Sequence, residues 1–229
     1  MKRFPTDLNT IIRNYEHEYI IVGRFTIHEI EGFKFHDVPG DRGGPTKGGI
    51  SKLWVETVKP IELDVEDIEF LEENEMLYLY YKYFWVRFNC DKLKCGFNVF
   101  HFINVVVAST VAGRAIQYAA NKFGHNLKED GNIGPLSQKA INSHHENDFD
   151  LIIAYASEYL YEYYTNIAIN SVKRLDNLNS LKNGNDLISN TQMKFLLGWM
   201  ARIKRTMDYV NKHRIEKFSH RGILAYKHL

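Results

Sequence analysis

The segment between residues 28 and 51, HEIEGFKFHDVPGDRGGPTKGGIS, limits what this chain can fold into more than any other part of it. It contains six glycines and two prolines. Glycine adopts turn conformations freely and proline fixes its own backbone angle, so this density excludes a packed helix or a long strand. The sequence therefore predicts a shaped loop and a short hairpin that closes near Ile50, with Ser51 as the cap of the next helix.

Apolar residues at helical spacing predict helices on both sides of this loop. One helix is expected from about residue 19 to residue 31, and Gly32 is its expected end. Another is expected over residues 64–87, where Asp64 and Asp67 occupy the positions of a capping pair. The sequence thus predicts a mainly α chain with a small β-hairpin that carries the loop.

The second half of the chain is predicted to be helical. A core helix is expected over residues 98–123, and its most apolar run of about fifteen residues is shorter than the ~20 residues that a bilayer crossing requires. Pro135 suits the first turn of a short helix. A long helix toward residue 170 and an amphipathic helix over 192–210 follow, before a polar, basic tail at 211–229.

Composition excludes several classes of function. The chain has 229 residues, with 29 Lys and Arg against 28 Asp and Glu, so its bulk charge favours neither nucleic acid nor a charged membrane. Cys90 and Cys95 match no zinc-site spacing and are expected to be reduced structural thiols. The adjacent His144 and His145 would diverge by about 100° on a helix and make a poor shared metal site. We expect no metal and no other cofactor.

The loop and its flanks carry an ordered set of short motifs. Glu31-Gly32 lies at the expected helix end, Asp41-Arg42-Gly43-Gly44-Pro45-Thr46 follows, and Gly49-Ile50-Ser51 closes the set. This order resembles the amino-terminal signature of glycoside hydrolase family 108, the muramidase and secretion-activator group found in phage endolysins and bacterial export systems.

Three later segments resemble the same family in the same order. Phe84-Trp85 stands at the place of a Tyr-Trp helix end. DGNIGPLSQKAI, at residues 130–141, and GWMARI, at residues 198–203, are similar to the carboxy-terminal region that is usually labelled peptidoglycan-binding. Together the motifs cover about residues 20 to 210.

The resemblance implies a lysozyme-like α+β fold that is mainly α, forming a single domain over residues 1–229. Within it, residues 20–96 would be the catalytic part and residues 97–210 a helical, peptidoglycan-binding-like part, with the basic tail at 211–229. The expected partner is the peptidoglycan glycan strand. The tail is expected to make at most weak contacts with anionic lipid or wall polymer, and the protein is expected to be a monomer that binds no nucleic acid.

The resemblance also implies the chemistry. Cleavage of a glycosidic bond normally uses two carboxyl groups. Glu31, at a helix end beside apolar residues, would be the general acid, because a partly desolvated carboxyl keeps its proton until the leaving oxygen takes it. Asp41 would be the second, ionised carboxylate, with Asp37 as its rival. The Thr46 hydroxyl would help to place the attacking water, which favours an inverting reaction.

Other residues are expected to hold the substrate. Gly43 and Gly44 lack side chains and would let a polysaccharide approach the main chain closely. Trp54, Tyr83 and Trp85 would offer flat faces to sugar rings, although for Trp85 the alternative, that of a simple core aromatic, is favoured.

The expected function is that of an N-acetylmuramidase of the lysozyme type, a bacteriolytic, endolysin-like enzyme that cleaves between N-acetylmuramic acid and N-acetylglucosamine. The alternative is a catalytically inactive wall-binding or virion protein of the same fold. His101 and Val105 favour that alternative, because the family suggests an Asp and an Asn at these places.

The amino-terminal residues also bear on where the protein would act. Arg13, Glu16 and Glu18 interrupt the apolar run that a classical signal peptide requires. Synthesis in the cytoplasm is therefore expected, followed by delivery to the periplasm by a holin or a dedicated export route.

Overall fold

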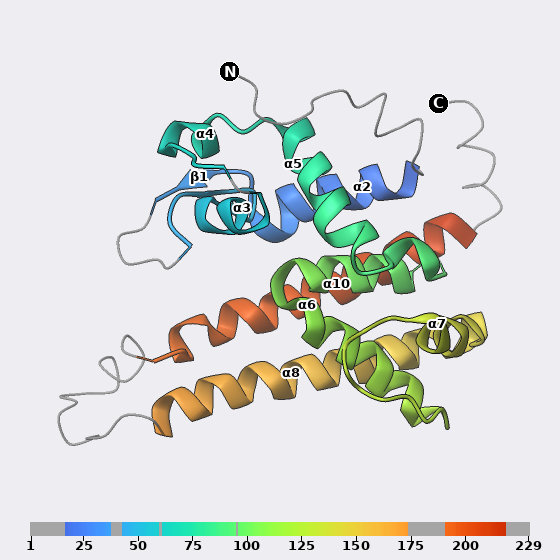
Figure 1. Ribbon diagram of the computed structural model, residues 1–229. Helices are drawn as coiled ribbons and strands as arrows, with labels where there is room; N and C mark the ends of the chain where they lie inside the picture. Colours follow the sequence, from blue (N-terminus) through green and yellow to red (C-terminus); the bar gives the residue numbers. More distant parts are fainter. Residues whose placement is uncertain (1–16, 38–42, 60, 95, 174–190, 219–229) are drawn as a thin grey trace. The chain divides into compact units, whose positions relative to one another are not determined.

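The structure is a computed structural model, and it is mostly helical (Figure 1). It describes residues 17–37, 43–59, 61–94, 96–173 and 191–218. The chain divides into two compact units, residues 1–91 and residues 92–229. The expected tail at 219–229 lies outside the described residues.

The first unit begins with helix α2 (His17–Phe25), which continues directly into the π-helix η1 (Thr26–Glu31). Gly32 follows with a φ of 82°, a left-handed conformation that favours glycine. The expected helix over 19–31 and its end are therefore confirmed. Its last part differs from the expectation because it is π-helical. This geometry is rare in proteins, and where it occurs it is often at a functional site.

Three short strands form the sheet. They are β1 (Phe35–His36), β2 (Thr46–Lys47) and β3 (Ile50–Ser51), paired antiparallel in the order β1-β2-β3. The expected hairpin is present as the β2–β3 pair, and β1 adds a third strand to it. Gly48 and Gly49 connect β2 to β3 with φ values of 54° and 75°, as a two-residue hairpin turn requires.

Four further helices complete the larger part of the first unit: α3 (Lys52–Val58), α4 (Val65–Glu69), α5 (Glu73–Tyr80) and the π-helix η2 (Tyr81–Val86). Ser51 caps α3 as expected, since its Oγ accepts a hydrogen bond of 3.3 Å from the Trp54 amide. A short 3-10 helix, η3 (Cys90–Lys92), follows. Cys90 is a buried free thiol, and burial raises its pKa well above the usual value.

The prediction of one continuous helix over 64–87 is wrong. The Asp64 amide donates to Asp67 Oδ2 at 2.9 Å, so the predicted capping pair does start a helix, but that helix ends at Glu69. A second capping pair begins the next helix, because the Glu72 amide donates to Glu75 Oε2 at 2.8 Å. The two carboxylates thus begin α4 and α5 separately.

Aromatic packing joins α2 to the second half of this unit. The fully buried Tyr19 donates its hydroxyl proton to the Leu77 carbonyl oxygen and meets Trp85 edge-on, with ring centroids 5.3 Å apart. A Cβ on Gly23 would lie only 2.6 Å from Leu77 Cδ2, so α2 and α5 approach closely at this glycine. The position of Glu31 at the end of η1 is therefore tied to the core.

The second unit contains α6 (Phe97–Lys122), α7 (Pro135–Asn142), the 3-10 helix η4 (Glu146–Asp148), α8 (Phe149–Lys173) and α10 (Met193–Phe218). Helix α8 packs against both α6 and α10, and α6 also contacts α7 (Figure 1). The expected starts of these helices are confirmed. Helix α10 extends eight residues into the predicted basic tail, since 211–218 contain neither glycine nor proline.

Helix α6 is the most apolar helix among the described residues. By length and composition alone it could cross a membrane, because an 18-residue window of this helix has a mean hydropathy of 1.6. However, 67% of that window is buried within the structure. It also bends at Ala108, where φ is −144° and ψ is 65°.

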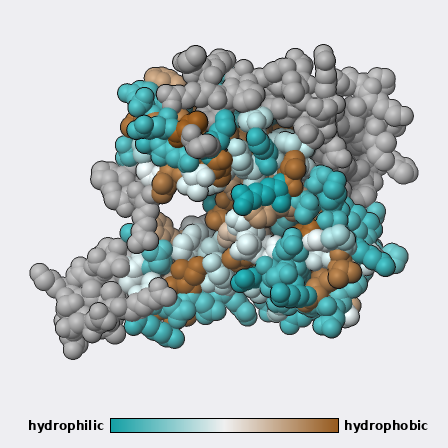
Figure 2. Space-filling view, in the orientation of Figure 1, coloured by the Kyte–Doolittle hydropathy of each residue, from teal (hydrophilic) through white to brown (hydrophobic). Residues whose placement is uncertain are grey.

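On the face of the molecule that Figure 2 shows, hydrophobic residues form small groups on a mainly hydrophilic surface.

The loop before α7 is fixed by one glutamine. Gln117 Oε1 accepts a hydrogen bond from the Gly131 amide at 2.8 Å, and its Nε2 donates to Asp130 Oδ1 at 3.1 Å. Gly131 has a φ of 83°, and a Cβ there would lie 2.2 Å from the Thr110 carbonyl oxygen. The Asp-Gly-Asn-Ile-Gly-Pro motif is therefore a packed structural turn against α6.

We expect Gly131→Ala to lower the free energy of unfolding by at least about 2 kcal/mol, because it adds a backbone collision to the cost of a left-handed alanine. Gly124→Ala is the matched control, since Gly124 has a φ of 89° and open space around it. The control should lose only about 1 kcal/mol. Equal losses in denaturant titrations of the two variants would contradict the packing described here.

Candidate active site

Glu31 is held between a π-helix and a hairpin turn. It is the last residue of η1, its side chain is half-buried, and its Oε1 atom is buried. A Cβ on Gly49 would lie 2.5 Å from Glu31 Cγ and 2.7 Å from Glu31 Cδ. The β2–β3 turn therefore touches the carboxyl group directly, and glycine at position 49 is required by this approach as well as by its positive φ.

Tyr80 secures the same turn from the other side. Its hydroxyl donates to the Gly48 carbonyl oxygen at 2.6 Å, and a Cβ on Gly49 would lie 2.6 Å from that hydroxyl. Burial raises the pKa of Tyr80 far above its usual value, so the phenol stays protonated and remains a donor. Glu31, Gly49 and Tyr80 thus form one packed group.

Sequence reasoning missed Tyr80, although the family motif includes Gly49. The only signal was a tyrosine-rich run, YLYYKYF, at residues 78–84, in which periodicity does not distinguish one ring from another. The second missed feature is a polar cluster at the α2–η1 junction, formed by Arg24, His28 and Glu73.

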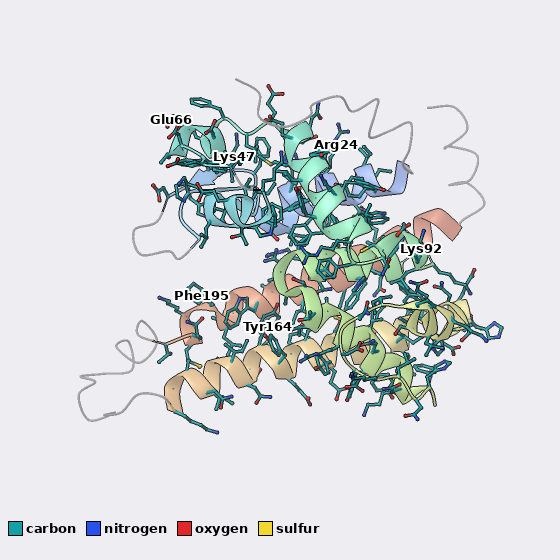
Figure 3. The ribbon with its side chains drawn as sticks, in the orientation of Figure 1. Arg24, Lys47, Glu66, Lys92, Tyr164 and Phe195 are labelled. Atoms are coloured by element: carbon teal, nitrogen blue, oxygen red, sulfur yellow. The ribbon has the colours of Figure 1, made fainter. Side chains whose placement is uncertain are left out.

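Arg24 and His28 both bind Glu73, and Figure 3 labels Arg24 on α2. Glu73 Oε1 accepts from Arg24 Nε at 2.7 Å, and His28 Nε2 lies 2.7 Å from Glu73 Oε2. Burial alone would raise the pKa of the Glu73 carboxyl, but the hydrogen bonds with His28 and Arg24 lower it below the usual value. These contacts anchor the α2–η1 junction to the first turn of α5.

Phe33 lies on this group. Its ring stacks on His28 with centroids 4.8 Å apart, and Lys47 Nζ lies 5.1 Å from its centroid. Lys47 also donates to the Glu69 carbonyl oxygen at 2.7 Å. The segment after Glu31 is therefore fixed to β2 and α4 by stacking and by a cation–π contact.

Thr46 lies on β2, half-buried, opposite His36 and Ser51 in the strand register. Its Oγ1 donates to the Gly44 carbonyl oxygen at 2.8 Å. Because this bond uses the hydroxyl proton, the same oxygen can act only as an acceptor toward a water.

The two glycines expected to admit the substrate differ in their surroundings. The Gly43 carbonyl oxygen accepts from the Leu53 amide at 3.3 Å, which joins the loop to α3. Gly44 has a φ of 70°, and a Cβ there would meet nothing within 4 Å. Space beside the main chain is thus present at Gly44.

Two of the three expected sugar-binding aromatics lie together. Trp54 and Tyr83 are both half-buried and meet edge-on, with centroids 5.7 Å apart. Trp85 is only 2% exposed and packs against Tyr19. Its assignment to sugar binding is therefore corrected to its alternative, that of a core aromatic.

The remaining predicted residues lie elsewhere. Asp41 is outside the described residues, and its rival Asp37 is exposed just after β1. His101 and Val105 are fully buried in α6. Among the described parts of the chain, no group of three His, Cys, Asp or Glu side chains is placed to hold a metal ion.

The small sheet, the surrounding helices and the acid at their junction define a mainly helical, lysozyme-like α+β protein. Residues 25–108 match the family model of glycosyl hydrolase 108, and residues 111–204 match that of a predicted peptidoglycan domain. These consecutive matches confirm the family expected from the sequence: the chain joins a glycosyl hydrolase 108 region to a predicted peptidoglycan domain. It is accordingly a glycosidase-class protein that acts on peptidoglycan.

One solved structure, entitled "Structure of Brucella abortus SagA", is similar to this chain with a TM-score of 0.63 and 17% sequence identity. The similarity covers 86% of this chain and 97% of that chain. At this identity it concerns the fold alone, and it confirms the expected fold class. No curated protein matches the chain.

Removing the Glu73 carboxylate should change the acid dependence of stability. Because the folded pKa of Glu73 is lowered, its contribution is present above the unfolded value of about 4.3 and is lost as the pH falls through the folded pKa. We expect Glu73→Gln to lower the free energy of unfolding at pH 7 by up to about 1 kcal/mol, with the difference shrinking below about pH 4. The exposed Glu66→Gln is the control. A constant difference across this range would refute the assignment.

A side chain at position 49 should displace the Glu31 carboxyl. On the expectation from the sequence that Glu31 is the general acid, Gly49→Ala should lower peptidoglycan hydrolysis roughly 100-fold or more, because a shift of about 1 Å in a catalytic group has that effect. Gly124→Ala carries similar backbone strain far along the chain and should keep its activity. The check is release of soluble fragments from purified sacculi, measured alongside thermal unfolding of both variants.

Proposed function

We propose that this protein is an N-acetylmuramidase and that Glu31 is its general acid. The observation that carries the proposal is the packing of the Glu31 side chain against Gly49 and the Tyr80 hydroxyl, at the junction of η1 and the β2–β3 turn. Packing against the turn restricts the orientation of this carboxyl, as a group that must deliver a proton at one point requires. The glycosyl hydrolase 108 match over residues 25–108 supports the same reaction class.

In the proposed reaction Glu31 gives its proton to the oxygen that leaves between N-acetylmuramic acid and N-acetylglucosamine. The second carboxylate is Asp41, with Asp37 as its rival, and it stabilises the positive sugar ring or activates water on the opposite face. Thr46 supports this step as an acceptor, because its hydroxyl proton is already bound to the Gly44 carbonyl oxygen. An acceptor that holds the water favours direct attack and inversion.

The glycan strand is proposed to pass over Gly43 and Gly44 and over the rings of Trp54 and Tyr83. Gly44 leaves open space beside its main chain, and Gly43 precedes it in the motif. Trp54 and Tyr83 offer two adjacent, partly exposed rings. Aromatic faces of this kind bind the apolar faces of sugar rings while their polar edges stay in water.

The cellular setting is part of the proposal. An enzyme of this specificity would act in the periplasm as a bacteriolytic, endolysin-like protein, after synthesis in the cytoplasm and delivery by a holin or a dedicated export route. Detection of the protein at the wall of lysing cells, by fractionation, would support this setting.

A second candidate is a catalytically inactive protein that binds the wall. His101 and Val105, both fully buried in α6, favour it because the family suggests an Asp and an Asn at these places. Such a protein would sediment with sacculi and release no fragments. The same hydrolysis assay separates the two candidates.

Glu31→Gln should reduce hydrolysis of purified sacculi at least 100-fold, because the amide cannot supply the proton. Mass spectrometry of the digest should then lack fragments that end in reducing muramic acid. Glu29→Gln is the matched control, since Glu29 lies on the same π-helix and is exposed. Unchanged activity of Glu31→Gln, or an equal loss in both variants, would disprove the role given to Glu31.

A further inference from the structure

A group of partly exposed aromatic rings lies where α6 and α8 meet. We call it the tyrosine surface, and it consists of Tyr118, Phe123, Tyr155 and Tyr159 with Lys122 at its edge. All four rings are half-buried, and Lys122 is exposed. None of these residues belongs to the site around Glu31.

Contacts between the rings define the shape of this surface. The rings of Tyr118 and Tyr159 have centroids 5.3 Å apart, and those of Phe123 and Tyr155 are 6.2 Å apart. Tyr155 and Tyr159 are four residues apart on α8, so they share one face with a rise of about 6 Å between them. Lys122 Nζ lies 4.6 Å from the Tyr118 centroid.

The four rings stay partly exposed beside the core of this unit. Aliphatic residues of α8 lie deeper in that core, and Ile152, Ile153 and Leu160 are at most 1% exposed. Tyr164 shows what a structural tyrosine of α8 looks like. It is 6% exposed and stacks on Trp199 with centroids 4.9 Å apart, on the side of α10 (Figure 3).

We propose that the tyrosine surface binds the glycan strand of peptidoglycan. Ring faces suit the apolar faces of pyranose sugars, and tyrosine hydroxyls at their edges can bond to sugar hydroxyl and acetamido groups. The surface lies wholly within the predicted peptidoglycan domain match at residues 111–204. The inference rests on the proposed function, because it assigns to that activity a second place of contact with the same polymer.

Charge favours a peptidoglycan strand over a neutral polysaccharide. Lys122 keeps its positive charge, because a hydrogen bond with Tyr118 raises its pKa. An ammonium group beside the rings suits the carboxylates of the peptide stems that peptidoglycan carries. Glu158 lies near Lys122, so the surface is of mixed charge and does not form the uniformly basic patch that anionic lipid attracts.

The test uses the full chain with Glu31→Gln, so that binding is measured without cleavage. Tyr155→Ala with Tyr159→Ala is compared with Tyr161→Ala, a half-buried tyrosine on another side of α8. We expect the double variant to bind purified sacculi at least tenfold more weakly, and the control to change by less than about twofold. Thermal unfolding of each variant measures whether α8 remains folded.

A second measurement does not depend on folding of the variants. Chemical nitration of tyrosines in the parent chain, mapped by mass spectrometry, is carried out with and without a soluble peptidoglycan fragment. Tyr118, Tyr155 and Tyr159 should be protected by the fragment, and Tyr161 should not. Equal reactivity with and without bound fragment at all four tyrosines would overturn the inference.

The outcomes separate the inference from the proposed function. Tight binding by the double variant, while the Glu31-intact chain still cleaves sacculi, overturns the tyrosine surface alone. A parent chain that neither binds nor cleaves sacculi overturns both. If the double variant kept its binding to sacculi and lost binding to anionic phospholipid vesicles, the surface would be assigned to lipid. If it kept sacculus binding and lost self-association in sedimentation, the surface would be assigned to a second copy of the chain. Either result would also overturn the inference.

Discussion

The first unit depends on the close approach of one hairpin turn to two helical side chains. Gly49 brings the main chain against Tyr80 and Glu31, and Gly48 brings it against Met76, at distances that leave no room for a Cβ. The Tyr80 hydroxyl fixes the turn through the Gly48 carbonyl oxygen, and the turn in its place restricts the Glu31 carboxyl. The Glu31 carboxyl is therefore oriented by a backbone segment that has no side chains of its own, and this contact restricts its conformational freedom.

The helices that carry this group are braced on two sides. Inside, Tyr19 connects α2 to Leu77 and Trp85 in the buried core. Near the surface, Arg24 and His28 hold Glu73 at the start of α5. Both η1 and η2 are π-helical, and π-helical turns have less favourable hydrogen-bond geometry than α-helical turns, so such bracing is needed to keep them in place. The π-helix η1 carries Glu31 at its last position, and π-helical turns are frequent at functional sites.

Much of the fold follows from local signals in the sequence. Gly32 ends its helix, Ser51 caps α3 and Pro135 begins α7, because each acts within a few residues of itself. The break between α4 and α5 was not predictable from periodicity, since Glu72 and Glu75 look like part of a solvated acidic run until they are seen to cap a helix start.

The candidate site was predictable in part for the same reason. The Glu31-Gly32 motif lies within one short segment, and the structure does place Glu31 at the helix end that this pattern predicts. Tyr80 acts on Gly48 across 32 positions of the chain, and nothing local distinguishes it from its tyrosine neighbours. Trp85 is a different case. Tryptophan is a residue type that often binds sugar rings, but this side chain is buried in the core.

Helix α6 has a consequence for how this protein can be divided. The glycosyl hydrolase 108 match ends at residue 108, where the helix bends, and the peptidoglycan domain match starts at residue 111, still within the same helix. The border between the two modules thus has no linker. Recombination that exchanged one module for another would have to rejoin the chain in the middle of α6. The apolar residues on the two sides of the junction would then have to stay on the same face of the helix. Natural or engineered exchange should therefore favour swapping the whole pair.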